Sequence, residues 1–390
     1  MWDRKMADLI FLSYIFLSDG RNDDQCQEYV NKAIRSLTAL TANYKDSAPL
    51  YAALGRAYIY KYGLYPNEEI WAQNAHVNCM RAAALLGAVD GDVARTLGRL
   101  YARKREFRAA LSYLQSALNK QPYDVEALLE TAGVYARNRQ FAEAEELYKR
   151  VITLRQDWWP GQNEIGGFYF DRRRYAEAER HWNQVVRLLP DSDIGFTNLG
   201  HLYLIQGSFD AALGKYKQSL SINETPEAYG GLSWHSYLTN QFEDARVYAE
   251  KGLKLDEADT TLLDHKGSAC RWLPNREAEG RAAFKQAVEL KLVELAIDPW
   301  DALGWANLAA WQAKLGQAKE AESSLRRALS YDETDPDVMN IAVLIYHLAG
   351  RGNEALRWAE LAVKNGGQLD ELISDPELAS LRDQLARIRG

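Results

Sequence analysis

The stretch LGRLYARKREFRAA, residues 97–110, decides the fold because its pattern returns three times at intervals of 34 residues. The later copies read TAGVYARNRQFAEA, IGGFYFDRRRYAEA and LGHLYLIQGSFDAA. Each copy holds a tyrosine, then an aromatic residue, then an alanine at fixed spacing. These positions are Tyr101, Phe107 and Ala110; Tyr135, Phe141 and Ala144; Tyr169, Tyr175 and Ala178; and Tyr203, Phe209 and Ala212. Self-similarity at this period across Gly91 to Thr225 indicates an array of helix–turn–helix repeats.

The residue types in this pattern suit a pair of packed helices, a first (A) and a second (B). A glycine inside a helix costs about 1 kcal/mol relative to alanine, so it needs a packing reason. We expect the small residues on helix A, at Gly98, Ala132, Gly166 and Gly200, to let helix B approach closely. Pro122 and Pro190 follow helix B, where proline stops a helix without losing a needed hydrogen bond. One pair cannot bury its apolar face alone, so the pairs are expected to stack into a solenoid.

The pattern resembles the tetratricopeptide repeat, and the resemblance covers nearly the whole chain. It implies an all-α fold in which about nine to ten helix pairs form an α-solenoid. The resemblance further implies a right-handed superhelix closed by a C-terminal capping helix. No alternating strand pattern competes with this interpretation.

We predict a single solenoid over residues 1–390, in which the first two repeats and the repeat at 260–301 are irregular. An amphipathic helix after Gly367 is expected to close it. The segment around Gly63 adds roughly eight residues to the second repeat, and a helix from about Glu277 to Ile297 is roughly two turns longer than the norm. The predicted parts are a divergent first pair (4–44), a repeat with a loop insertion (48–90), regular repeats (91–259), a repeat with an extended second helix (260–301), the last two repeats (302–367) and the capping helix (368–390).

Composition narrows the classes of partner. The net charge of −7 argues against nucleic acid or an anionic membrane surface as the main partner. The three cysteines are far apart, which favours neither a disulfide framework nor a metal site. The apolar run Leu9 to Leu17 is too short to span a membrane, and we interpret it as the first helix of the array. A cytoplasmic location is expected, or a periplasmic one if the chain is part of a membrane-spanning protein.

Motifs that would indicate catalysis are absent from the sequence. There is no phosphate-binding glycine loop, no zinc-protease motif and no nucleophile elbow, and the six histidines have no ligand spacing. We therefore expect neither an enzyme nor a cofactor.

The face lined by the A helices is the predicted peptide-binding groove. Exposed aromatic side chains mixed with hydrogen-bonding groups suit peptide recognition. The alternative is that Phe170, Trp234 and Tyr237 pack between neighbouring A helices. Asn198 and Asn307 occupy the position where the resemblance implies an asparagine that holds the backbone of a bound peptide. The other expected groove residues are Asn163, Phe170, Thr197, His201, Leu204, Trp234, Tyr237, Asp264 and Arg271.

A cluster of basic residues recurs at the A–B turn of three consecutive repeats. Stacking would align them into a basic ridge that attracts an acidic or phosphorylated partner. The alternative is a solvated turn that keeps the chain soluble. The ridge residues are Arg103, Lys104, Arg105, Arg137, Arg139, Arg172, Arg173 and Arg174.

Several further stretches resemble the C-terminal repeat regions of bacterial signalling proteins, which follow a serine/threonine kinase, a nucleotide cyclase or a winged-helix domain. They include Trp158-Trp159-Pro160, Arg271-Trp272-Leu273-Pro274-Asn275 and Ser374-Asp375-Pro376-Glu377-Leu378. The resemblance implies a non-enzymatic regulatory module that binds a protein or peptide, either within a larger protein or as an adaptor. Two alternatives stay open: a scaffold that self-associates, and the substrate-docking region of an enzyme.

Overall fold

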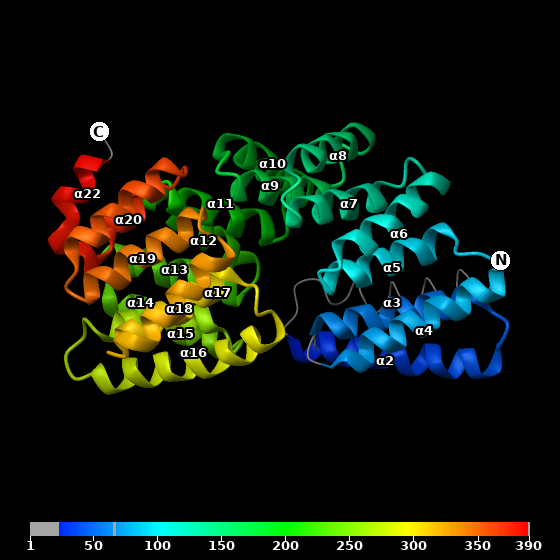
Figure 1. Cartoon of the computed structure of the whole chain (residues 1–390), viewed down its shortest axis with the longest axis horizontal. Coiled ribbons are helices and arrows are strands. Elements are labelled where there is room, and N and C mark those ends of the chain that lie inside the picture. The colour runs from blue at the N-terminus through cyan, green and yellow to red at the C-terminus, as the bar shows by residue number, and fades with distance from the viewer. Residues whose placement is uncertain (1–22, 65–67, 389–390) are drawn as a thin grey trace. The chain divides into compact units, whose positions relative to one another are not determined.

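The computed structural model describes residues 23–64 and 68–388, and every regular element in those ranges is helical. The predicted all-α fold of stacked helix pairs is therefore confirmed. The interpretation of Leu9 to Leu17 as a helix falls outside the described residues. The chain forms two compact units, Met1–Phe168 and Tyr169–Gly390. Figure 1 labels the helices along the chain.

The first unit alternates A and B helices, and its first three helices are longer than the others. Helix α9 begins in this unit and ends in the second. The bounds are α2 (Asp23–Asn43), α3 (Ala48–Leu64), α4 (Glu69–Leu86), α5 (Gly91–Arg103), α6 (Phe107–Lys120), α7 (Val125–Arg137), α8 (Phe141–Leu154) and α9 (Trp159–Asp171).

The second unit continues the alternation and ends in three short elements. Odd-numbered helices from α3 to α19 are A helices, and the even-numbered helices that follow them are B helices. The bounds are α10 (Tyr175–Leu188), α11 (Ile194–Ile205), α12 (Phe209–Ile222), α13 (Pro226–Leu238), α14 (Phe242–Leu253), α15 (Thr260–Cys270), α16 (Glu277–Ile297), α17 (Ala302–Lys314), α18 (Ala318–Tyr331), α19 (Pro336–Leu348), α20 (Gly352–Lys364), α21 (Asp370–Ser374), the 3₁₀ helix η1 (Pro376–Leu381) and α22 (Arg382–Ile388).

The turn between helices A and B has one geometry in most repeats. A residue with left-handed backbone ends helix A, and the next N–H donates to the carbonyl of the recurring tyrosine, as in Glu106 to Tyr101 (2.9 Å) and Gln140 to Tyr135 (2.9 Å). Glycine or asparagine suits this conformation. The turn residues are Arg105, Arg139, Arg173, Gly207, Asn240, Gly316 and Gly350. Asn275 also has left-handed backbone, but there the next N–H donates to the carbonyl of Leu273 (3.4 Å).

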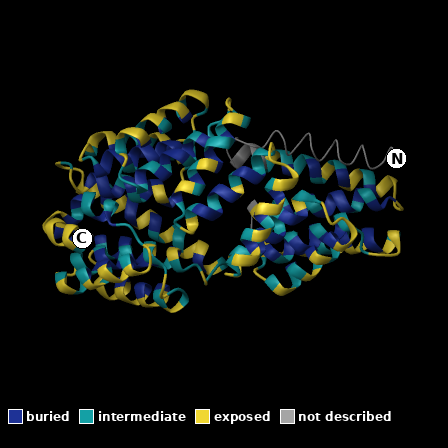
Figure 2. Cartoon of the chain, turned by 90° about the horizontal axis from the view of Figure 1, so that it is seen from above, coloured by how far each residue is buried: buried dark blue, intermediate teal, exposed yellow. Residues whose placement is uncertain are grey.

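Small residues bring the two helices of a pair together, as the sequence predicts. A Cβ added to Gly98 would lie 2.6 Å from Cγ of Leu114, and one added to Gly200 would lie 2.6 Å from Cε1 of Tyr216. The recurring alanines of helix B are fully buried. Figure 2 shows buried residues on the helix faces that meet other helices, and exposed residues on the outer faces and turns.

The closing segment is three short helices, whereas the sequence predicts one amphipathic helix after a short loop. Asp375 precedes Pro376 and has extended backbone (φ −65°, ψ 120°), which ends α21. Proline disfavours helical backbone in the residue before it, so the chain turns at this point. The carboxylate of Asp375 then accepts the N–H of Glu377 (2.9 Å) and starts η1.

Candidate functional site

Helices α13, α15 and α17 of the second unit present a set of polar and aromatic side chains that we call the A-helix face. It consists of Trp234, Tyr237, Asp264, Arg271 and Lys314. Trp234 and Tyr237 lie three positions apart on α13, a spacing that puts them on one side of a helix. Arg271 follows the last residue of α15, and Lys314 is the last residue of α17.

Aromatic stacking fixes the tryptophan at the centre of this face. The Trp234 ring is stacked between Tyr237 (centroids 5.0 Å apart) and His265 (5.1 Å). Tyr237 is buried, whereas Trp234 is half-buried. Both residues therefore pack against neighbouring side chains. The indole N–H of Trp234 and the hydroxyl of Tyr237 are still available as hydrogen-bond donors to the closing segment.

Three carboxylates of the closing segment meet this face, and we call them the acidic edge: Glu371, Asp375 and Glu377. The indole Nε1 of Trp234 donates to Oε1 of Glu371 (3.0 Å), and the Tyr237 hydroxyl donates to Oδ1 of Asp375 (3.2 Å). Arg271 makes a two-point contact with Glu377, from Nε to Oε1 (2.6 Å) and from Nη2 to Oε2 (3.4 Å). Part of the predicted groove is thus occupied by the chain's own C-terminal segment.

The opposite side of the closing segment is apolar. Leu369, Leu372, Leu378 and Leu381 are buried in one cluster with Val343 of α19 and with Ala355 and Ala359 of α20. The segment therefore joins the last repeat to helices more than 100 residues earlier in the sequence.

An ion pair between Lys314 and Asp264 lies next to Arg271 and helps to hold it in place. Nζ of Lys314 lies 2.7 Å from Oδ1 of Asp264 and donates to Oγ of Ser268 (2.7 Å). Burial alone would raise the pKa of Asp264, but Lys314, His265 and the Ser268 hydrogen bond together outweigh it and the pKa is lowered. Arg271 donates in turn to the carbonyl of Lys314 (3.2 Å), which orients its guanidinium toward Glu377.

Two of the three carboxylates lie where charge is disfavoured. Burial raises the pKa of Asp375 to about 6, and it raises the pKa of Glu371 as well. The hydrogen bond from Trp234 lowers the pKa of Glu371, and the hydrogen bond from Tyr237 lowers the pKa of Asp375, but neither offsets the effect of burial. The A-helix face therefore accepts hydrogen-bond acceptors at these two positions better than it accepts negative charge.

The remaining predicted groove residues are dispersed. Asn163 belongs to the first unit, and Asn307 is half-buried on α17. Burial lowers the pKa of His201 to about 4, and its ring lies 5.4 Å from that of Tyr216. The other four are in packed surroundings: Phe170 against Tyr175 and Trp182, Thr197 hydrogen-bonded to Ser219, Leu204 in the core, and Asn198 half-buried on α11.

Several residues of the predicted basic ridge already have acidic partners. Lys104 pairs with Glu69 (2.7 Å), Arg173 with Asp337 (2.8 Å) and Arg174 with Glu177 (2.6 Å). Arg103, Lys104, Arg105, Arg137 and Arg139 belong to the first unit, and Arg172, Arg173 and Arg174 belong to the second.

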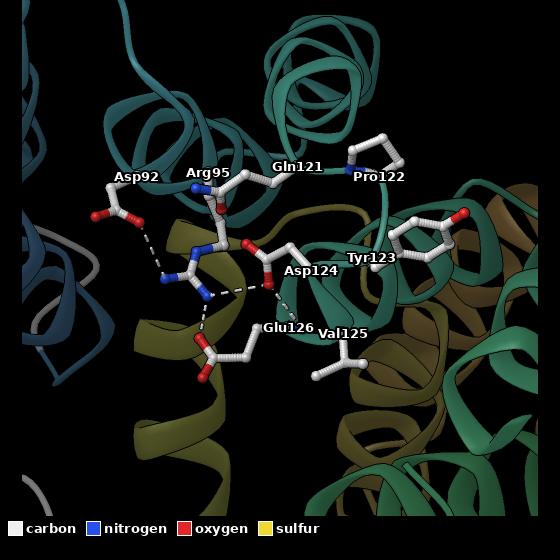
Figure 3. Close-up of a pocket in the computed structure, with 8 residues that line it drawn as sticks. All are labelled: Asp92, Arg95, Gln121, Pro122, Tyr123, Asp124, Val125 and Glu126. Carbon is white, nitrogen blue, oxygen red and sulfur yellow. Dashed lines mark hydrogen bonds and ion pairs between the residues drawn. The ribbon is translucent and has the colours of Figure 1, made fainter. Parts of the chain in front are cut away.

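The first unit has an open hollow of about 480 Å³ between the starts of α5 and α7 (Figure 3). Arg95 lies at its centre and pairs with Asp92, Asp124 and Glu126. Tyr123 at the rim is 73% exposed. These carboxylates already share one arginine, so the hollow has no evident chemistry beyond that ion-pair cluster.

The acidic edge was missed in the sequence analysis. Its signal is the run Glu371-Leu372-Ile373-Ser374-Asp375-Pro376-Glu377, in which acids and leucines occupy different sides of a short amphipathic segment. Within residues 23–64 and 68–388, no cluster of histidine, cysteine or carboxylate side chains could hold a metal ion. No helix in the described part of the chain is long and apolar enough to cross a membrane.

Fold and site together define a helix-pair repeat protein whose A helices carry a polar contact surface. Residues 95–158 and 169–225 match the family model of the tetratricopeptide repeat. No curated protein matches the chain.

The chain is similar to several solved structures at low identity, with TM-scores below 0.5. A structure of pilF from Pseudomonas aeruginosa is 22% identical over 54% of this chain and 92% of its own, with a TM-score of 0.42. The Cut9–Hcn1 hetero-tetramer of APC/C gives 17% identity over 97% of this chain and 76% of its own, with a TM-score of 0.47. A tetratricopeptide repeat protein from Parabacteroides merdae is 17% identical over 68% of this chain and 98% of its own, with a TM-score of 0.45.

Proposed function

We propose that this chain is a non-enzymatic module that binds a protein or peptide partner through the A-helix face of its second unit. Tetratricopeptide repeats in general mediate protein–protein interactions. The observation that carries the proposal is the set of donors on Trp234, Tyr237 and Arg271, each already in contact with one acceptor of a short segment.

The residue types on this face support a binding role. Tryptophan, tyrosine and arginine are the types most enriched among the residues that dominate binding energy. Stacking holds the Trp234 ring, and the Lys314 carbonyl holds the Arg271 guanidinium, so little side-chain freedom is lost when a ligand binds.

We further propose, from the resemblance noted above, that this binding serves regulation in a bacterial signalling protein of the cytoplasm. The partner is expected to be a protein segment, with an acidic or phosphorylated sequence as one option for the basic ridge. The sequence of the complete parent gene tests the signalling role: a kinase, cyclase or winged-helix domain beside the repeats supports it, and a different neighbour contradicts it.

Site-specific photo-crosslinking tests the binding face. A benzophenone amino acid replaces Trp272, which follows Arg271 and is 43% exposed, and in a matched control it replaces Trp300, which is 61% exposed on the loop after α16. We expect a partner protein to crosslink from position 272 and not from position 300. Equal capture from both positions, or none from 272, contradicts the proposal.

Self-association is a second candidate because the extended part of α16 exposes an apolar stripe. Leu292 is 47% exposed and Val293 is 57% exposed, and the nearby Trp300 and Leu303 are also exposed. A second copy of the chain could cover this stripe. A molar mass that rises with concentration and returns to the monomer value in L292E/V293E would favour this candidate. A constant monomer mass would exclude it.

A further inference from the structure

The closing segment presents different chemistry on its two sides. The acidic edge contacts the A-helix face, and the leucines contact α19 and α20. The segment is joined to α20 through Gly366 and Gly367, and Gly366 has left-handed backbone (φ +87°). Leu369 to Leu381 is thus a short peptide-like element that the chain places on its own contact surface.

This internal fit is imperfect at two identifiable positions. Glu371 and Asp375 bring carboxylates to donors that are neutral, on Trp234 and Tyr237, and only Glu377 meets a cation. A segment whose role was only to cover the last repeat would be more stable with amides at positions 371 and 375. A local conflict of this kind, at a contact surface, is typical of a functional site.

The charged groups around the two carboxylates do not resolve the conflict. Asp337 opposes the charge of Glu371, while Arg173 favours it, and Asp375 itself adds repulsion. Lys314 favours the charge of Asp375, and Glu377 opposes it. Burial is the largest influence on both groups.

Taking the proposed function as its starting point, we propose that Leu369–Leu381 is an internal competitor for the A-helix face. We infer that the partner supplies a segment with leucines matching Leu372 and Leu378, a carboxylate opposite Arg271, and neutral amide acceptors where this chain has Glu371 and Asp375. Such a segment replaces every contact of the internal one and avoids placing carboxylates against the neutral donors of Trp234 and Tyr237. The internal segment is tethered, with an effective concentration on the order of mM, so the partner must bind better than the internal copy.

The test uses the full chain and one labelled peptide. The probe is residues 368–384 with Gln at 371 and Asn at 375, and its binding is followed by fluorescence anisotropy. The matched protein variant is E371Q/D375N, which carries the same two amides internally and is expected to hold its own segment more tightly. At pH 7.5 we expect this variant to bind the probe at least roughly ten-fold more weakly than the unchanged chain. At this pH the internal segment of the unchanged chain is charged and therefore docks most weakly on the A-helix face.

Two further readings complete the test. Lowering the pH from 7.5 to 5.5 should weaken probe binding to the unchanged chain, because Asp375, whose pKa is raised to about 6, gains a proton and the internal segment docks more tightly. The same change of pH should leave E371Q/D375N unaffected. A control peptide that also carries Lys in place of Glu377 should bind neither protein. Equal probe affinity for both proteins at pH 7.5 would overturn the proposal, as would equal binding of the control peptide.

The outcome is separable from that of the proposed function. If the probe fails to bind while position 272 still crosslinks a partner, the A-helix face is a binding surface and the competitor proposal is wrong. If neither result is obtained, the proposed function itself is wrong.

Discussion

Arg139 has left-handed backbone (φ 61°) at a turn where other repeats place glycine or asparagine. Side chains other than glycine, asparagine and aspartate pay roughly 1–2 kcal/mol in this conformation. Arg105 and Arg173 occupy the equivalent positions. Three consecutive repeats thus place arginine at this turn at some cost to stability.

We expect Arg139→Gly to be more stable than Arg139→Ala by about 1 kcal/mol. Both substitutions remove the same side chain and its interactions, so their difference isolates the backbone conformation. Urea denaturation measures the two free energies of unfolding. Equal stability of the two variants would show that the turn carries no strain.

Asp375→Asn tests the buried charge of the acidic edge. The unfolded pKa is 3.8 and burial raises the folded value to about 6, so the folded state binds more protons between these values. Stability from this group is therefore highest below about pH 4 and is lost as pH rises to about 6. A shift of this size corresponds to roughly 3 kcal/mol.

We therefore expect Asp375→Asn to raise the free energy of unfolding of the second unit at pH 7.5, and to raise it less at pH 5. Asparagine can keep both the Tyr237 contact and the cap on η1, so the comparison isolates charge. Other groups titrate in the same window, and taking the difference between the variant and the unchanged chain at each pH removes their contribution. A difference that does not change with pH would contradict the raised pKa of Asp375.

Helix pairing in the first unit depends on where glycine is placed. Gly98 on α5 has no room for a Cβ, because Leu114 of α6 lies 2.6 Å from where it would be. Gly133 on α7 has room, since the nearest atom is the Tyr148 hydroxyl at 3.9 Å. We expect Gly98→Ala to destabilise the protein by about 1–3 kcal/mol through overpacking, and Gly133→Ala to stabilise it by up to about 1 kcal/mol through helix propensity. Thermal unfolding of both variants checks the prediction, and equal melting temperatures would contradict it.

The helices were predictable because their signals are local. The recurring tyrosine, the small residues and the spacing between repeats are all read within one repeat, and α16 spans the stretch from Glu277 to Ile297 in which an extended helix was expected. Trp234, Tyr237 and Arg271 could be assigned to A helices in the same way. Their contacts with Glu371, Asp375 and Glu377 could not, because the partners are 137, 138 and 106 residues apart. Such contacts depend on how many small rotations between repeats add up, which one sequence does not reveal.

In the second unit, the closing segment adds long-range contacts to an architecture otherwise built from neighbours. Stability in a repeat array is approximately a sum of terms within repeats and between adjacent ones. Arg271 and Glu377 connect the end of α15 directly to η1, although helices α16 to α21 lie between them in the sequence. A change at Arg271 should therefore destabilise η1 as well as α15, whereas in a simple array it would destabilise only the neighbouring repeats.

Arg271→Gln tests this coupling. Glu377 has a side chain only 8% exposed, and removing its arginine leaves a buried carboxylate without that partner, at a cost of about 1–3 kcal/mol. We expect amide hydrogen exchange to rise roughly ten-fold in both α15 and η1, and to stay unchanged in α5 to α8 of the first unit. A conservative Arg271→Lys should restore part of the protection, because lysine keeps the charge but not the two-point geometry. If exchange rises around α15 alone, the contact with η1 does not contribute to stability, and the second unit behaves as a simple array.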